Sequence, residues 1–250
     1  MTAFLAACAT KVSLYVLLRF DFFVFQGNLV GHDFQFAAYL MPLAIMGILV
    51  GSAVAMFERN IKRMLAFSSV AQIGYIMLGA SLVTATGLTA ATLHMFNHAL
   101  AKGGMFLAIA AVTMVAAGCR LNDVAGMARR MPWTFAALVV AGLSLIGVPG
   151  TAGFISKWYL INAALELETG GVALVALILI SSLMAVVYIW RIIEAAYFGE
   201  PSEQTTASAP PALVVILWAV AIANIGFGIA PDLPLSLSQT AADILLGHVQ

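Results

Sequence analysis

Three lysines fall inside long apolar stretches of the sequence. They are Lys11, Lys102 and Lys157. A lysine at the centre of a membrane-spanning helix costs roughly 2.5–3.5 kcal/mol on insertion scales, so it persists where it faces a bundle interior or water. Burial disfavours the charged form, so such a lysine can release and regain a proton. The alternative is that each ammonium group snorkels to the membrane surface, which explains three such lysines less well than one.

Two histidines precede one of these lysines on the same predicted helix. His94, His98 and Lys102 are spaced four residues apart, which places them on one helical face over roughly 12 Å. Histidine titrates near pH 6.5, so it can pass a proton at physiological pH. Two other interpretations stay open. The histidines could be hydrogen-bonded core residues, or could share a metal, although no carboxylate or cysteine in this stretch would complete the ligand set.

Helix-breaking residues interrupt the apolar stretch 133–165. They are Gly147, Pro149, Gly150 and Gly153. Proline and glycine in a helix interior break or kink it. Broken helices at membrane depth are tolerated where they are buried or line a cavity, and the ion sites of transporters lie at such half-helix ends. We expect one discontinuous span with Lys157 on its second half. The alternatives are a simple kink and a short loop joining two spans.

The composition identifies lipid as the main solvent of the chain. Of 250 residues, 63% are hydrophobic and only 9% are charged, and the mean hydropathy is +1.04. Soluble domains are about half apolar and a quarter charged. The net charge of zero gives no indication of nucleic-acid binding, and Cys8 and Cys119 give no metal spacing or disulfide framework. No phosphate loop, dinucleotide fingerprint or catalytic triad is visible, so neither a cofactor nor a metal is expected.

Stretches long enough to cross a bilayer, which takes roughly 20 residues, recur along the sequence. We predict an all-α polytopic transmembrane bundle of about seven spans, one of them discontinuous, in a single membrane domain covering 1–250. The predicted spans are about 2–20, 36–57, 66–84, 88–117, 133–165, 171–197 and 211–230. The tail after Pro234 places its apolar residues near one helical face, which indicates a helix on the membrane surface.

Charged residues sort to two sides of this map. The links on one side hold Arg59, Lys62, Arg63, Arg120, Arg129, Arg130 and Arg191. The links on the other side hold Arg19, Asp21, Asp33, Glu166 and Glu168. By the positive-inside rule the basic side is cytoplasmic, so the amino terminus lies inside and the carboxyl terminus outside. A wrong number of spans would have scrambled this sorting.

Four segments resemble one family of membrane proteins. They are residues 60–75 (NIKRMLAFSSVAQIGY), 94–102 (HMFNHALAK), 147–157 (GVPGTAGFISK) and 10–15 (TKVSLY). These segments are similar to the antiporter-like subunits of respiratory complex I, of Mrp-type multisubunit Na+/H+ antiporters and of membrane-bound hydrogenases. The resemblance runs over most of the chain and is nearest to the D subunit of the Mrp antiporters.

The resemblance implies a fold of about fourteen helices, with two inverted five-helix repeats and a polar axis along the membrane midplane. The second repeat would cover about 36–197. Lys11 would match the lysine of the eighth helix, which links two half-channels. His94, His98 and Lys102 would match the connecting relay of the eleventh helix, and Lys157 the ionisable residue on the broken twelfth helix. The chain begins inside the eighth helix, so a longer protein or another polypeptide is expected to supply the first repeat.

The sequence therefore predicts a proton-translocating subunit, or part of one, in a multisubunit complex of the inner (plasma) membrane. Its partners would be other membrane subunits, lipid, protons and, in an antiporter, Na+. The coupled process would be cation exchange or quinone- or hydrogen-linked electron transfer, as in an NADH:quinone oxidoreductase, although this chain shows no redox site of its own. The alternatives are a scaffold subunit that transports nothing and an intramembrane enzyme, for which the sequence offers no catalytic pair.

Overall fold

The computed structural model describes residues 8–24, 36–116, 118–200 and 209–247, and within these residues it contains helices and no strand. The helices are α2 (Thr10–Arg19), α3 (Phe36–Phe57), α4 (Ile61–Ser81), α5 (Ala85–Thr113), α6 (Pro132–Ile146), α7 (Ala152–Leu165), α8 (Gly171–Phe198), α9 (Pro211–Ile229) and α10 (Asp232–Leu245), with the short turns η2 (Phe20–Val24), η3 (Leu121–Val124) and η4 (Met127–Arg129). The all-α prediction is confirmed. Asp33 and the first residues of the predicted first span lie outside the described residues.

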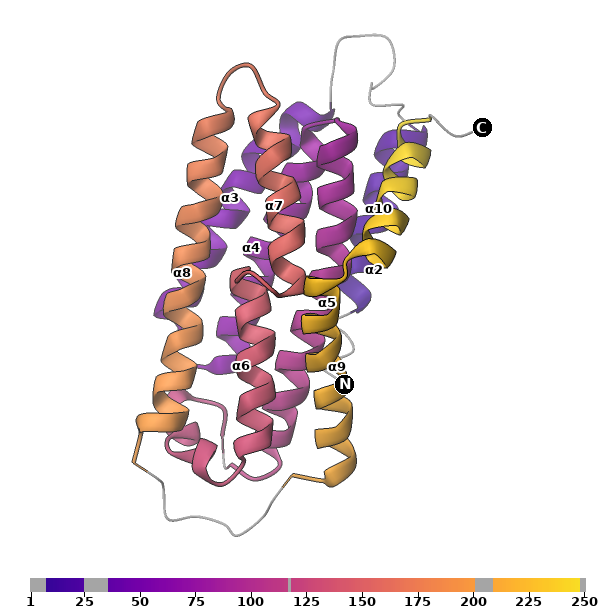
Figure 1. Cartoon of the computed structure of the whole chain (residues 1–250). Helices are drawn as coiled ribbons and strands as arrows, with labels where there is room; N and C mark the ends of the chain where they lie inside the picture. Colours follow the sequence, from indigo (N-terminus) through magenta and orange to yellow (C-terminus); the bar gives the residue numbers. More distant parts are fainter. Residues whose placement is uncertain (1–7, 25–35, 117, 201–208, 248–250) are drawn as a thin grey trace.

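Five helices in the described part of the chain are long and apolar enough to cross a membrane. They are α3 (from Tyr39), α4, α5, α8 and α9. With 15 and 14 residues, α6 and α7 are each too short to cross alone, but they follow one another end to end along the bundle (Figure 1). They form one span broken at 147–151. The predicted discontinuous span is thus confirmed, and the alternative of a loop joining two full spans is not observed.

Polar side chains set the starts of the two helices that carry most of the site. Asn60 Oδ1 accepts a hydrogen bond from the backbone N–H of Arg63 at 3.2 Å, so α4 begins at Ile61. Thr84 Oγ1 accepts from the backbone N–H of Gly87 at 3.0 Å, so α5 begins at Ala85. Such N-caps satisfy N–H groups that a helix start leaves free. The two spans predicted at 66–84 and 88–117 are therefore both present, but each helix begins and ends three to five residues earlier than predicted.

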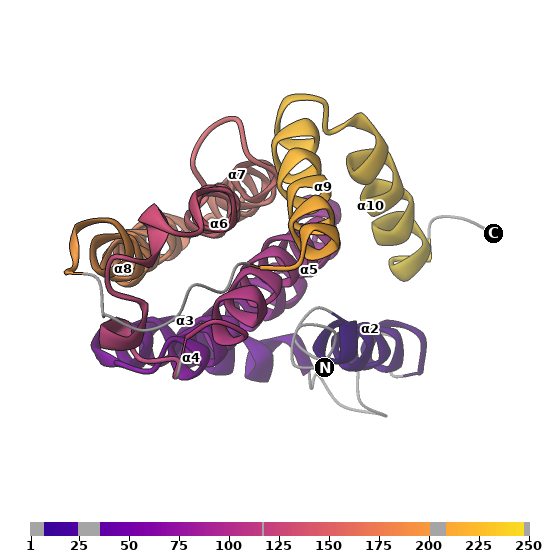
Figure 2. The ribbon, with the colours of Figure 1, turned by 90° about the horizontal axis from the view of Figure 1, so that it is seen from below.

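The helices lie in two layers with α5 between them (Figure 2). One layer holds α2, α3 and α4, and the other holds α8, the α6–α7 pair, α9 and α10. Buried apolar side chains form three clusters, and α5 contributes side chains to all three, although only Ala90 to one of them. Because α5 has neighbours from both layers, its polar side chains can be kept away from lipid.

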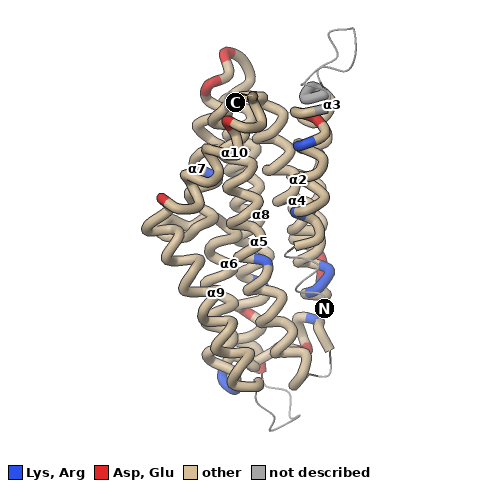
Figure 3. Tube along the Cα trace, turned by 90° about the vertical axis from the view of Figure 1, so that its right-hand side faces the viewer, with Lys and Arg blue, Asp and Glu red and all other residues tan. Residues whose placement is uncertain are grey.

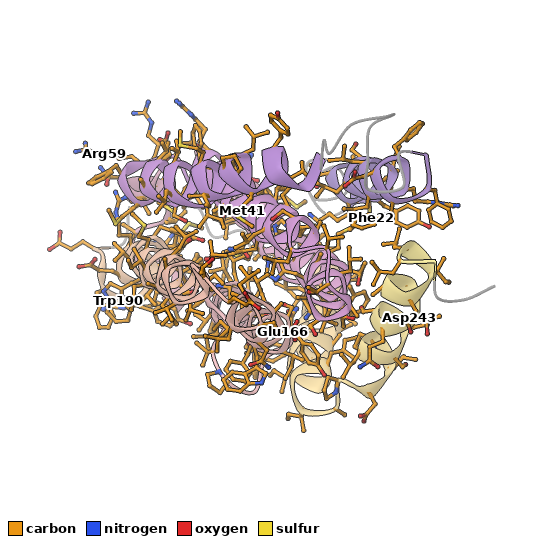
Figure 4. The ribbon with its side chains drawn as sticks, turned by 90° about the horizontal axis from the view of Figure 1, so that it is seen from above. Phe22, Met41, Arg59, Glu166, Trp190 and Asp243 are labelled. Carbon is orange, nitrogen blue, oxygen red and sulfur yellow. The ribbon has the colours of Figure 1, made fainter. Side chains whose placement is uncertain are left out.

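Large apolar side chains cover the outside of the bundle. On α8, Val172 is 76% exposed, Leu183 67% and Trp190 52%. Figure 4 shows Trp190 at the outer edge of the molecule, directed away from the other helices. A surface of this kind is stable in hydrocarbon and costly in water. The fold is therefore that of a multi-pass membrane protein.

The last two helices pack against other parts of the bundle, and α9 matches the predicted span 211–230. α10 runs beside the upper part of α5 (Figure 1) instead of lying across the end of the bundle. Its Ala242 and Leu245 are buried among side chains of α2, α4 and α5. Its partner α9 ends against the break in the neighbouring span, where a Cβ added to Gly228 would overlap the Thr151 backbone. The apolar face of the tail thus packs partly on protein, while Leu237 is 64% exposed, and the position of this helix at the membrane surface stays a prediction.

The charge sorting of the sequence is preserved in the fold. The basic loops that join α3 to α4 and α5 to α6 lie in the lower half of Figure 1. The loop with Glu166 and Glu168 lies at the opposite end, where Figure 3 shows acidic residues between α7 and α8. The basic loops are held together by the backbone N–H of Ile61, which donates to the carbonyl oxygen of Cys119 at 2.8 Å.

Candidate functional site

The five basic side chains that the sequence singles out are all buried in the bundle. Lys11 is 7% exposed, His94 3%, His98 2%, Lys102 0% and Lys157 5%. They come from α2, α5 and α7, three helices in different positions of the fold. The ammonium groups of Lys102 and Lys157 form hydrogen bonds inside the bundle, so snorkelling does not describe them.

The ammonium group of Lys102 is held by α4. Its Nζ donates to the carbonyl oxygen of Leu65 at 2.6 Å and to the hydroxyl oxygen of Ser68. The Ser68 hydroxyl in turn donates to the same carbonyl at 3.0 Å. These acceptors are uncharged. A buried ammonium without a paired carboxylate is costly, and this favours a group that alternates between charged and neutral forms.

Lys157 caps the first half of the broken span. Its Nζ donates to the carbonyl oxygens of Leu145 and Ile146, at 3.2 and 2.7 Å, and to Ser182 Oγ at 2.9 Å. The last carbonyls of a helix lack partners within the helix and carry partial negative charge. The end of α6 therefore attracts this cation. Its Nζ also lies 4.9 Å from the ring centroid of Tyr75, which adds a cation–π contact.

The four predicted helix breakers lie in or beside the turn that separates α6 from α7. Gly147 and Gly150 have φ angles of +89° and +85°, a left-handed conformation that glycine adopts without steric cost. Pro149 lies between them, and Gly153 lies in the first turn of α7. A Cβ on Gly153 would overlap the carbonyl oxygen of Ser144. The absence of a side chain at Gly153 therefore lets the two half-helices approach.

His94 has a partner at each ring nitrogen. Its Nε2 lies 2.9 Å from Gln72 Oε1, which is an acceptor, so this nitrogen carries a proton. Its Nδ1 lies 2.8 Å from Ser156 Oγ. The His98 ring is stacked beside it with centroids 6.2 Å apart. Because both nitrogens of His94 are engaged, the geometry does not support a metal shared with His98.

His98 and Lys11 connect the histidine stripe to α2. Neither ring nitrogen of His98 forms a hydrogen bond within the described part of the chain, although the ring is buried. His98 interacts electrostatically with Lys11, Lys102 and His94. Lys11 also interacts with His94 and with Lys102, and Lys157 interacts with His94. Contacts through the Tyr75 ring join Lys157 to His94, and the His94 ring is stacked beside His98. Lys11 lies within electrostatic range of both histidines, and Lys102 within range of His98.

Several polar partners of these groups were not assigned to the site by sequence reasoning. They are Ser68, Gln72, Tyr75, Ser156, Ser182 and Tyr188. The first three have a sequence signal, because positions 68, 72 and 75 recur on one face of α4. Tyr188 of α8 has a buried hydroxyl group without a hydrogen bond to the described residues, close enough to the side chains of Ser68 and Gln72 to interact with them.

An apolar cavity of about 370 Å³ lies between α7 and α8 and reaches Lys157. Lys157 and Ser182 are its polar lining, and its apolar walls include Trp158 and Leu183. The side chains of Trp158 and Leu183 are 52% and 67% exposed. The cavity therefore extends from the buried ammonium group toward the membrane-facing surface.

A multi-pass helical bundle with buried lysines, a histidine stripe and a lysine-capped helix break belongs to a recognisable class of membrane proteins, those with ionisable groups at discontinuous helices. Residues 1–185 match the family described as "NADH:quinone oxidoreductase/Mrp antiporter, TM". The chain is a member of this family, as its motifs indicated.

Relatives with curated names are N subunits of NADH-quinone oxidoreductases. That of Desulforudis audaxviator is 44% identical over 209 residues, which cover 83% of this chain and 41% of the relative. That of Desulforamulus reducens is 33% identical over 246 residues, 98% of this chain and 50% of the relative. This chain thus spans about half the length of these relatives. They are N subunits, whereas the sequence motifs pointed to the D subunit of Mrp antiporters.

Solved structures give the same assignment of fold. A chain of the archaeal membrane-bound sulfane sulfur reductase matches with a TM-score of 0.87 and 31% identity, covering 98% of this chain and 49% of that one. A chain of the Mrp complex from Dietzia sp. DQ12-45-1b matches with a TM-score of 0.84 and 27% identity, covering 95% and 51%. Both are subunits of multisubunit membrane complexes.

Proposed function

We propose that this chain is part of a proton-translocating membrane subunit and that its buried basic side chains carry the protons. The observation that supports this most directly is the set of five protonatable groups, all at least nine-tenths buried, of which Lys102 and Lys157 are held by neutral acceptors. Structural stability does not require buried cations held by neutral acceptors. A relay does require groups that gain and lose a proton in place.

The relay would run from α2 through α5 to α7. Lys11 exchanges a proton with His98 or Lys102, and His94 connects the stripe to Lys157. At Lys157 the carbonyl end of α6 stabilises the charged form. Charge on one group opposes charge on the next because both are cations. Successive groups therefore exchange a proton instead of all being charged together.

The proposed partners and coupled process are taken from the complexes to which the relatives belong. We propose that the chain works beside other membrane subunits in the inner (plasma) membrane, coupled to cation exchange, with Na+ as a candidate, or to quinone-linked electron transfer. The six successive helices from α3 to α8, with α6 and α7 counted as one broken span, would form a five-span repeat over about 36–197. The missing half of the relay would come from the remainder of the relatives' length.

The test replaces Lys102 or Lys157 with alanine in the complete complex, reconstituted into proteoliposomes with a pH-sensitive dye inside. Loss of a proton-transfer group should lower the proton flux by about 100-fold, with assembly of the complex unchanged. Lys62→Ala is the matched control, because Lys62 is an exposed lysine in the first turn of α4. Unchanged flux in assembled Lys102→Ala and Lys157→Ala complexes would contradict the relay and support a scaffold role.

A further inference from the structure

The hydroxyl group of Ser156 has two acceptors within reach. It lies 2.8 Å from Nδ1 of His94 and 3.1 Å from the carbonyl oxygen of Gly153. Ser156 is fully buried and His94 is 3% exposed, so these contacts are made inside the bundle. A hydroxyl group donates one hydrogen bond and can accept others. Ser156 therefore satisfies one of the two acceptors at a time.

The two choices correspond to the two protonation states of His94. The Nε2 proton donates to Gln72 Oε1 in both states. In the neutral ring, Nδ1 is an acceptor and the Ser156 hydroxyl donates to it. In the charged ring, Nδ1 carries a proton and donates to Ser156 Oγ, while the hydroxyl turns to the Gly153 carbonyl. The Oγ–H bond stays intact, and the only proton gained is the one on Nδ1.

We propose that Ser156 is a two-position hydroxyl that lets His94 gain and lose a proton without any movement of the buried helices. The inference rests on the proposed relay and specifies which group makes a buried histidine usable in it. A buried donor or acceptor left without a partner is costly, so a histidine with a fixed partner set favours one protonation state. The alternate acceptor for Ser156 removes that preference.

The acceptor for the turned hydroxyl belongs to the helix break. The Gly153 carbonyl lies in the first turn of α7, and the backbone N–H of the same residue donates to Ser144 Oγ of α6 at 3.1 Å. A change in the protonation state of His94 therefore changes which hydrogen bonds form in the first turn of α7, the helix that also positions Lys157. Ser156 and Lys157 are adjacent in α7, so the hydroxyl that contacts His94 of α5 and the lysine share one helix.

The charged and titratable groups that face His94 come from several helices. They are Lys11 of α2, Tyr75 of α4, His98 of α5 and Lys157 of α7. The described helices α6 and α9 contain no titratable side chain, and Asp232 and Asp243 of α10 are not buried. The cations oppose protonation of His94 because like charges repel. The acceptor role of Ser156 for the charged ring offsets this opposition.

The test compares Ser156→Ala with Ser156→Thr in the complete complex, and the readouts are proton flux and 15N NMR of the histidine rings as a function of pH. Alanine leaves the Nε2–Gln72 hydrogen bond intact and removes the partner of the charged Nδ1–H. We expect the flux to fall about 10-fold and the midpoint of His94 protonation to move about one pH unit lower, which corresponds to a lost hydrogen bond to a charged group. Threonine keeps the hydroxyl and should restore both values to within about twofold.

Ser52→Ala is the control, because Ser52 is equally buried and its hydroxyl pairs with Ser181 at 2.7 Å. Equal flux and equal His94 midpoints in Ser156→Ala and Ser52→Ala would overturn the inference. A fall in flux without a shift of the midpoint would also overturn it, since Ser156 would then act only on structure. Failure of the relay itself is distinguishable: the Lys102→Ala and Lys157→Ala complexes would retain their flux, whereas the midpoint shift in Ser156→Ala can still be measured.

Discussion

At the scale of single residues, the basic side chains of the site are bound by neutral groups. Lys102 is bound by a carbonyl and a hydroxyl, and Lys157 by two carbonyls and a hydroxyl. A carboxylate partner would hold a lysine in its charged form. Neutral acceptors stabilise the ammonium group without holding the lysine permanently in its charged form. The site differs in this from a structural ion pair such as that between Arg63 Nε and Glu58 Oε2, which lie 3.3 Å apart at the start of α4.

We predict that Gln72→Leu destabilises the protein by about 1–3 kcal/mol, because it leaves the Nε2–H of His94 buried without an acceptor. Thermal unfolding of the purified full-length protein in detergent measures the effect. Gln239→Leu is the control, since Gln239 is exposed on α10 and should change stability by less than about 0.5 kcal/mol. Equal unfolding temperatures for the two variants would contradict the role given to Gln72.

The sequence was more informative about the donors of this site than about their acceptors. Lysines and histidines inside apolar stretches are visible without a structure, and all five are buried as expected. Their partners lie 62 residues away for His94 with Ser156, 37 for Lys102 with Leu65, and 25 for Lys157 with Ser182. Leu65 contributes a main-chain oxygen, as do Leu145 and Ile146 beside Lys157, and a main-chain oxygen has no signature in a sequence. Only helix packing decides which carbonyl meets which lysine.

At the scale of elements, the break between α6 and α7 was predictable because glycine and proline act locally. Two glycines with left-handed φ angles and a proline end one helix and allow another to begin along the same direction. The path of α10 was not predictable in this way. An apolar helical face suits a membrane surface and a protein groove equally, so tertiary packing decides between them.

Two glycine substitutions at the break should have unequal effects. Gly153→Ala places a Cβ on the Ser144 carbonyl oxygen, so α6 and α7 must separate. Gly150→Ala meets no atom within 4 Å, and its cost comes only from the left-handed backbone. We expect a loss of about 3 kcal/mol or more for Gly153→Ala and about 1–2 kcal/mol for Gly150→Ala. Chemical denaturation of the full-length variants measures both, and the reverse order would contradict the packing described at the break.

At the scale of the whole molecule, the two layers of helices enclose α5 and separate charge between the two ends of the bundle. Hydropathy located the five long apolar helices and the broken span, because lipid acts on whole segments. The distribution of lysine and arginine predicts which loops share a side of the membrane. The layered arrangement did not follow from the sequence. It depends on close contacts between small residues of one helix and the neighbouring helix, such as Gly74 of α4 against Ile48 of α3.

The charge separation predicts the orientation of the chain. In a background with Cys8 and Cys119 replaced by serine, Glu168→Cys should react with a membrane-impermeant maleimide added outside intact cells. Arg129→Cys should react only after permeabilisation, because the basic loops are expected in the cytoplasm. Both replaced residues are exposed. The opposite labelling pattern would contradict the predicted topology.

The contact between Gly228 and the α6–α7 turn links two interruptions in the bundle. A Cβ at Gly228 would overlap the Thr151 backbone and lie 2.5 Å from the Gly150 carbonyl oxygen, so no space separates the two backbones. A displacement of the turn beside Lys157 must therefore push α9. Through α10, that push is delivered to the cluster that also contains Leu14 and Leu18 of α2, the helix of Lys11. Continuous packing therefore connects the turn beside Lys157, through α9 and α10, to the helix that carries Lys11.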